Sequence, residues 1–400
     1  MKRLLVVLLI LLGATAFAQD GEDQPDSQSS LVERYISNFR NAGLETKMNI
    51  LDASESEDLE EMAPLYNEAL SYLVSNAADI ERVTTLQQMS DFVTERLEEA
   101  AYAPAAERLW ELFRNRRESR ARVSMLRAVG AAGEGNEQIV VNLNQWISDQ
   151  NGNAVAAGGE VDRQVLEQAV VTAGELGSPS TFPILLETRL LQFSNRISDA
   201  AEESLASLEG DTVELSIDAL DGRDPGEKYE AFDYLIDSDL LTEEERPVVA
   251  QAALNQALEA TVSDPTISEE IRQLRYDASE VVRQARFGEA TRSMIRHFNQ
   301  TVLEYERGVT TRQRVLEAVS GLGAMDTDEA AVRLTDYLEL LNTYTELDRP
   351  YDSQIVMEVI ANLERLGRPD SYNALFYCTL LDYPNRVKEA AREAMRAVSR

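Results

Sequence analysis

Two segments of this chain, residues 162–201 and 352–391, carry the same pattern 190 positions apart without a gap. The run from Leu176 to Phe182 reads LGSPSTF, and its counterpart from Leu366 to Tyr372 reads LGRPDSY. Further along, NRISDAA at 195–201 matches NRVKEAA at 385–391. Because two separate signatures share one offset, we interpret the chain as an internal repeat, which constrains its architecture more than any other signal.

The repeat has a period of about 44 residues. Gly133, Gly177, Gly323 and Gly367 each close an apolar helical pattern, and 44 residues separate the members of each pair. A glycine ends a helix readily because it adopts the left-handed backbone conformation without a steric penalty. The pattern therefore predicts units of two helices. The interval of 146 residues between the two pairs is not a whole number of units, which predicts an irregular middle at 211–308.

The residues of the repeat resemble a known family. The run from Pro384 to Met395, PNRVKEAAREAM, is similar to the second helix of a HEAT repeat, with its turn, its valine and its Ala-Ala pair. The resemblance covers roughly 119–208 and 309–398. It implies an all-α chain, a right-handed α-solenoid of HEAT-like helix pairs. HEAT repeats carry no catalytic residues as a family, so the resemblance implies protein binding rather than a reaction.

The first residues are typical of a secretory signal. Lys2 and Arg3 precede an apolar run, and Ala16-Phe17-Ala18 is an A-x-A cleavage site. The apolar stretch from Leu4 to Ala18 has 15 residues, whereas a bilayer span needs roughly 20. We expect a signal peptide at 1–18, cleavage after Ala18, and a periplasmic or secreted protein. An uncleaved membrane anchor is the alternative, and we expect no membrane span in the mature chain.

Strong acidity limits the partners of this chain. The net charge is −33 and the isoelectric point is near 4.4. Such a chain repels the phosphates of nucleic acids and anionic lipids, so we expect no nucleic-acid partner. Only four of the 38 cationic residues are lysines. Salt adaptation and codon bias both explain that composition, and the sequence does not separate them.

One short segment reverses this charge. Six arginines lie within fourteen residues that hold a single acid, Glu118. Such a strip suits carboxylate or phosphate groups of a partner. Pairing with acids of neighbouring repeats is the alternative. We predict that a protein partner docks on this strip, whose members are Arg114, Arg116, Arg117, Arg120, Arg122 and Arg127.

The sequence offers little for catalysis. It has one histidine, His297, within an apolar helical pattern, and one cysteine, Cys378, which we expect to be a small core residue. A histidine-based zinc site, a Ser-His-Asp triad and a Cys-His dyad each need partners for such residues. No phosphate-binding or dinucleotide-binding glycine motif is present. We therefore expect no enzyme activity, no cofactor and no metal.

These observations predict the organisation of the chain and a function. After the signal peptide we expect a disordered acidic lead-in at 19–30, a divergent helical region at 31–115 and the HEAT-like solenoid at 116–400. A flexible loop is expected from Asp149 to Asp162, which contains three glycines. The predicted function is a non-catalytic scaffold that binds a protein partner. An enzyme with an acid and arginine site on the concave face, or a self-assembling envelope component, are the alternatives.

Overall fold

A computed structural model describes residues 30–157, 161–260 and 265–399 of the chain. Those residues form α-helices joined by short turns, and they contain no β-strand. The fold is therefore an all-helical, repeat-like array of the α-solenoid class. The chain divides into two compact units, Met1–Arg116 and Arg117–Arg400. The expected signal peptide at 1–18 and all but the last residue of the lead-in lie outside the described residues.

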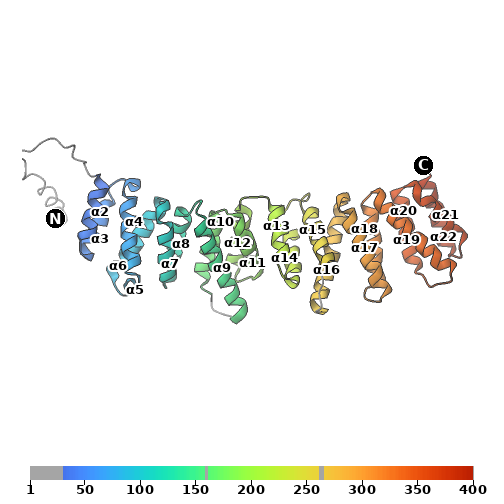
Figure 1. Cartoon of the computed structure of the whole chain (residues 1–400), viewed down its shortest axis with the longest axis horizontal. Helices are drawn as coiled ribbons and strands as arrows, with labels where there is room; N and C mark the ends of the chain where they lie inside the picture. Colours follow the sequence, from blue (N-terminus) through green and yellow to red (C-terminus); the bar gives the residue numbers. More distant parts are fainter. Residues whose placement is uncertain (1–29, 158–160, 261–264, 400) are drawn as a thin grey trace, which may run out of the picture. The chain divides into compact units, whose positions relative to one another are not determined.

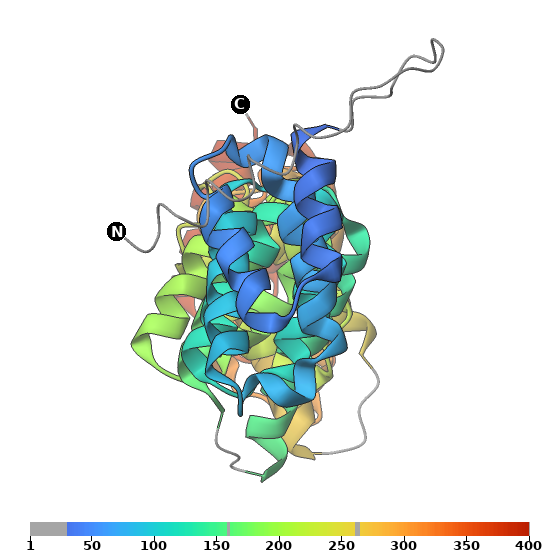
Figure 2. The same cartoon turned by 90° about the vertical axis from the view of Figure 1, so that its left-hand side faces the viewer.

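The first unit is a small bundle of helices. Its first two helices form an antiparallel pair, which faces the viewer in blue in Figure 2. Ser30 and Glu33 make a reciprocal capping box at the start of the first helix. The helix α4 packs against α2, α6 and α7, so it is the centre of this unit. Its α-helices are α2 (Leu31–Asn41), α3 (Leu44–Ser54), α4 (Leu59–Ser75), α5 (Ala77–Ile80), α6 (Thr84–Glu99) and α7 (Ala106–Asn115).

The second unit is a stack of helix pairs, and its helices form two layers. The pairs follow one another in chain order along the unit, as Figure 1 shows. Its α-helices are α8 (Ser119–Ala132), α9 (Glu137–Ala157), α10 (Arg163–Glu175), α11 (Phe182–Leu190), α12 (Asn195–Ser207), α13 (Thr212–Asp221), α14 (Pro225–Asp237), α15 (Arg246–Glu259), α16 (Pro265–Ala285), α17 (Thr291–Glu306), α18 (Arg312–Ala324), α19 (Asp328–Glu346), α20 (Ser353–Leu366), α21 (Tyr372–Leu380) and α22 (Asn385–Val398).

Even-numbered and odd-numbered helices form separate layers of this unit. In the even layer, α10 packs between α8 and α12, while α16, α18 and α20 each pack between even-numbered neighbours. In the odd layer, every helix from α11 to α19 packs between the odd-numbered helices before and after it. Each pair thus buries its apolar face against the next pair, which is the principle of a helical-repeat array.

The duplicated segment folds twice into the same elements. α11 and α21 occupy positions 190 residues apart, and so do the 3₁₀ turns Pro179–Thr181 and Pro369–Ser371 that precede them. Asp162 and Asp352 cap the helices that open the two copies. The internal repeat read from the sequence is therefore confirmed, and it covers α10 to α12 and α20 to α22.

Left-handed residues in the turns give the structural period. Gly177 and Gly367 have φ values of 65° and 64° just after α10 and α20, as predicted. The corresponding residues of other pairs are Gly135, Arg286 and Asp326. The spacing between successive left-handed residues is close to constant. It is 42 residues from Gly135 to Gly177, 40 from Arg286 to Asp326 and 41 from Asp326 to Gly367. The repeat is thus slightly shorter than the 44 residues expected.

Two of the predicted helix-closing glycines are not left-handed. Gly323 lies inside α18, and Gly133 at the end of α8 has a φ of −95°, so neither is left-handed. Both lie where a neighbouring helix approaches closely. A Cβ atom on Gly323 would stand 1.9 Å from Asn362 Oδ1 of α20. Gly133 does end α8, as the sequence predicted. The predicted left-handed conformation was wrong for both glycines, because a glycine required by helix packing looks the same in sequence as one required by a turn.

The predicted loop from Asp149 to Asp162 is mostly helical. α9 continues through Gly152 to Ala157, and only residues 158–160 lie outside the described residues. Gly152 faces open space, with no heavy atom within 4 Å of a built Cβ. Glycine lowers helix stability without forbidding a helix, so the glycine-rich composition misled the prediction.

The two kinds of glycine respond differently to alanine. Gly177→Ala should destabilise the chain by about 1–2 kcal/mol, because the left-handed backbone strains a side chain although space is available. Gly174→Ala should cost about 1–3 kcal/mol by overpacking, since its Cβ would lie 2.9 Å from the Cα of Ser204 in α12. Gly152→Ala is the control and should stabilise by roughly 0.5–1 kcal/mol. Urea denaturation measures all three, and a Gly177→Ala or Gly174→Ala variant as stable as Gly152→Ala would contradict the assignment.

Candidate functional site

The six arginines of the predicted docking strip are not equivalent. Arg114 and Arg116 belong to the first unit, and the other four belong to the second. The side chains of Arg114, Arg117, Arg120 and Arg127 are exposed. Arg116 is buried, with a residue exposure of 4%, and its guanidinium lies 3.7 Å from the Glu81 carboxylate. Arg116 is therefore an internal ion-pair residue, which corrects the prediction that it is displayed to a partner.

Arg122 is half-buried against other groups of the second unit. Its guanidinium lies over the Trp146 ring, 5.3 Å from the ring centroid. Burial lowers the pKa of Arg122, and the Asp162 carboxylate acts in the opposite direction. Four arginines of the strip, on two different units, are thus exposed.

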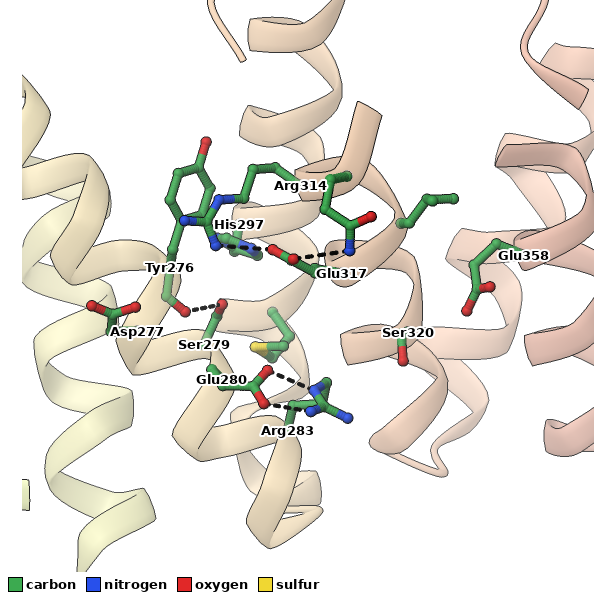
Figure 3. Close-up of a pocket in the computed structure, with 13 residues that line it drawn as sticks. Tyr276, Asp277, Ser279, Glu280, Arg283, His297, Arg314, Glu317, Ser320 and Glu358 are labelled. Atoms are coloured by element: carbon green, nitrogen blue, oxygen red, sulfur yellow. Dashed lines mark hydrogen bonds and ion pairs between the residues drawn. The ribbon is translucent and has the colours of Figure 1, made fainter. Parts of the chain in front are cut away.

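A cavity of about 530 Å³ opens in the second unit, and no sequence pattern pointed to it (Figure 3). Helices α16 and α18 form its walls, α17 contributes His297 and Met294, and α20 contributes Glu358. The wall carries four carboxylates against two guanidiniums, so an occupant would be neutral or cationic. These charged residues are Asp277, Glu280, Glu317, Glu358, Arg283 and Arg314.

His297 is the buried polar group of this cavity. It is 2% exposed, and its Nδ1 atom has no hydrogen-bond partner among the described residues. The edge of its ring meets Tyr276, with the ring planes at 87°. Burial, followed by the positive charges of Arg275 and Arg314, lowers the pKa of His297 to about 3. The imidazole is therefore neutral at physiological pH, and the expectation of a structural histidine agrees with this environment.

Ion pairs within the cavity wall neutralise two of its four carboxylates. Arg314 Nη1 donates to Glu317 Oε2 at 2.9 Å, and Arg283 Nε donates to Glu280 Oε2 at 2.7 Å, as Figure 3 shows. The hydrogen bond from Arg283 lowers the pKa of Glu280. The Asp277 side chain accepts two hydrogen bonds from Gln273 at 2.9 Å. The arrangement thus favours the ionised form of Glu280 rather than a protonated acid.

Cys378 lies in the core of α21, as the sequence predicted. It is fully buried, and burial raises the pKa of its thiol to about 12. Its counterpart in the first copy, Thr188, is buried as well. The thiol is thus protonated at neutral pH and unsuited to nucleophilic chemistry.

Within residues 30–157, 161–260 and 265–399, no three His, Cys, Asp or Glu side chains are grouped so that they could hold a metal ion. None of the helices in that part of the chain is long and apolar enough to cross a membrane.

Comparison with protein-family models and comparison with curated proteins each find no match. Among solved structures, the chain is similar to one from a study titled "A conserved phosphorylation switch controls the interaction between cadherin and beta-catenin in vitro and in vivo". That similarity has 13% identity, covers 98% of this chain and 94% of the other, and has a TM-score of 0.35. So distant a likeness assigns neither a family nor a function.

The buried imidazole should make stability depend on pH. The pKa of His297 is about 3 in the folded chain and near 6.5 when unfolded, so the unfolded chain takes up the proton first as the pH falls. The contribution of His297 is fully present above about pH 6.5 and is lost toward pH 3. Relative to His297→Gln, the unfolding free energy of the wild type should fall by about 1.4 kcal/mol per pH unit in this window.

Urea denaturation of both proteins from pH 7 down to pH 4 measures this difference. The carboxylates of the two proteins are the same, so their titration cancels in the comparison. A difference that stays constant with pH would show that His297 is solvated and titrates normally.

Proposed function

We propose that this chain is an exported, non-catalytic scaffold, a divergent HEAT-type array that holds a protein partner on one of its layers. The secretory signal in the sequence supports export. The stack of helix pairs in the second unit supports a binding role, because such arrays expose long surfaces of adjacent helices.

One observation carries the proposal. In the second unit, the large apolar side chains that are exposed on helices all belong to the odd layer among the described residues. α9, α17, α19 and α21 carry them, and the even helices carry none. Exposed apolar groups on one face and a polar opposite face are typical of a surface that meets a partner. These residues are Val141, Val155, Leu303, Val332, Leu340, Tyr372, Phe376, Tyr377 and Leu380.

The cavity beside His297 supports a second candidate, an enzyme built from acids and arginines. Against it stand the internal ion pairs of Glu280 and Glu317, because general acid catalysis needs a carboxyl group whose pKa is raised. Asp233 on α14 has a pKa raised by burial and by the charges of Asp237 and Asp277, but it is not part of the cavity wall. The binding role is therefore the better-supported one.

Export predicts a defined N-terminus. The mature protein from the periplasm or culture medium should begin at Gln19, because Ala16-Phe17-Ala18 presents small residues to the signal peptidase. N-terminal sequencing of the purified protein measures this. Recovery of full-length chain in the inner membrane would favour the uncleaved anchor instead.

The scaffold role predicts a partner that purifies with the chain. Tagged protein from exporting cells should capture one protein reproducibly, and mass spectrometry identifies it. If the partner also uses the arginine strip, changing Arg114, Arg117 and Arg120 to Glu should reduce the amount of partner captured. The remaining capture should also depend less on salt concentration than capture by the wild type does. The thermal midpoint should change little, since exposed ion pairs contribute only about 0–1 kcal/mol each.

Two outcomes of the capture experiment contradict parts of this proposal. Wild-type chain that captures nothing under cross-linking would remove the scaffold role. A triple variant that retains its partner at every salt concentration would remove the arginine strip as a docking site while leaving the scaffold role intact.

A further inference from the structure

We infer that the outer face of α21, together with the adjacent cationic flank of α22, is a docking site for an acidic amphipathic helix of a partner protein. This inference rests on the proposed scaffold function and locates its binding surface. The face is defined by Tyr372, Phe376 and Leu380, and the flank by Lys388, Arg392 and Arg396.

The apolar face of α21 forms a single row. Tyr372, Phe376 and Leu380 follow one another at intervals of four residues, which places them on one side of a helix. Their exposures are 40%, 46% and 63%, and the first two rings stack with their planes at 5°. Three large apolar groups in one row, all exposed, are costly in water unless something covers them.

The internal repeat shows what such a face normally meets. The positions equivalent to Tyr372 and Phe376 in the first copy are Phe182 and Leu186 of α11, and both are fully buried. In that copy α9 packs on one side of α11, while α13 and α14 pack on the other. α19 packs on α21 as α9 does on α11, but among the described residues no helix takes the place of α13 and α14. The same face is thus covered by helices once and left open once.

One of the two helices that cover this side of the first copy, α13, is acidic. α13 carries three acids and no lysine or arginine across Thr212–Asp221, and it buries Ala219 and Leu220. A helix is therefore the shape that suits the face of α11. By the internal symmetry, a helix is also the shape that suits the face of α21.

Charge beside the open face favours an acidic helix there. α12 in the first copy has one arginine and three acids, a net charge of −2, across residues 195–207. Its counterpart α22 has four cations and two acids across residues 385–398, a net charge of +2. Positions occupied by Ser198, Glu202 and Ala206 in the first copy hold Lys388, Arg392 and Arg396 in the second. Lys388, Arg392 and Arg396 therefore lie beside the copy whose face is open, although the chain as a whole has a net charge of −33.

The cationic flank of α22 is turned toward α21. In the first copy the same stripe faces α11, because Glu202, at the position of Arg392, pairs with Arg189 Nε of α11 at 3.2 Å. Arg392 and Arg396 follow Lys388 at intervals of four residues, so they continue the same stripe of the helix. A helix lying on Tyr372 and Phe376 with acids along one edge would place those acids beside this stripe. The apolar side chains of that helix would then contact the α21 row while its acids pair with the α22 cations, as in helix-in-groove recognition.

The test uses the full chain and two stapled peptide probes. The first probe has the α13 sequence, Thr212–Asp221, and the second carries Glu214→Lys, Asp218→Lys and Asp221→Lys in the same sequence. Fluorescence polarisation should show binding of the acidic probe and at least about tenfold weaker binding of the lysine probe. Tyr372→Ala with Phe376→Ala should weaken the acidic probe by about tenfold or more, because buried aromatic anchors dominate such interfaces.

Charge reversal should change the preference between the probes. With Arg392→Glu and Arg396→Glu, the lysine probe should bind more tightly than the acidic one. The matched control is Arg163→Glu with Arg307→Glu, two exposed arginines on other parts of the unit, which makes the same change in net charge. That control should retain the preference of the wild type, and Val141→Ala should retain its affinity. All these side chains are exposed, so the thermal midpoints should stay close to wild type.

Four results would overturn the inference. Equal binding of both probes, or unchanged binding after the α21 substitutions, would do so. So would a wild-type dimer in sedimentation velocity that Phe376→Ala dissociates, since a second copy would then cover the face. A partner that the wild type captures and the Tyr372→Ala, Phe376→Ala variant still captures would sink the docking site but leave the scaffold function. No capture by the wild type would sink the scaffold function instead.

Discussion

Each helix of the second unit has an apolar face that only its neighbours can cover, and the rest of the structure depends on this constraint. A buried leucine or phenylalanine contributes about 1.5–3 kcal/mol relative to the same side chain in water. No helix of a pair can obtain this alone, so α10 is stable between α8 and α12, and α11 between α9 and α13. The even layer completes its burial internally, whereas the odd layer does not. The uneven distribution of exposed apolar groups follows from that difference.

The turns supply the second constraint, because each pair must reverse direction within a few residues. Four of them share a design, in which one left-handed residue is followed two positions later by a 3₁₀ turn. Gly177 and Gly367 meet this need without strain, while Ala101 and Arg286 adopt the same conformation at a cost of about 1–2 kcal/mol. Packing elsewhere in the array must offset that cost. The turn is thus a requirement of the architecture, and the glycine is only the easiest way to satisfy it.

This distinction explains how far the sequence predicted the structure. The duplicated segment was predicted correctly, since both apolar spacing and turn residues agreed in two copies. Gly323 was misassigned because close approach of α20, a tertiary contact, is not visible in local spacing. Arg116 was expected at the surface because its opposing acid, Glu81, is distant in sequence. The cavity around His297 was missed for the same reason, since its residues come from four helices. Local sequence patterns thus predicted the helices, whereas contacts between residues distant in sequence determine which side chains are buried, paired or gathered in a cavity.

Phe182 and Tyr372 show this limit most clearly, because they are equivalent aromatic residues of one repeated pattern and have opposite surroundings. Apolar periodicity predicts that a helix face will be buried, but it does not show whether another helix of the chain packs on that face. Charge carries part of the missing information. Where α13 and α14 cover α11, the neighbouring α12 is acidic like the rest of the chain, and its Glu202 pairs with Arg189. Where the face is open, the equivalent residue is Arg392, and the position of Arg189 is held by Thr379. The second copy has therefore exchanged an internal ion pair for cations that face outward beside an apolar row, a combination that solubility alone does not require in a chain already so strongly charged.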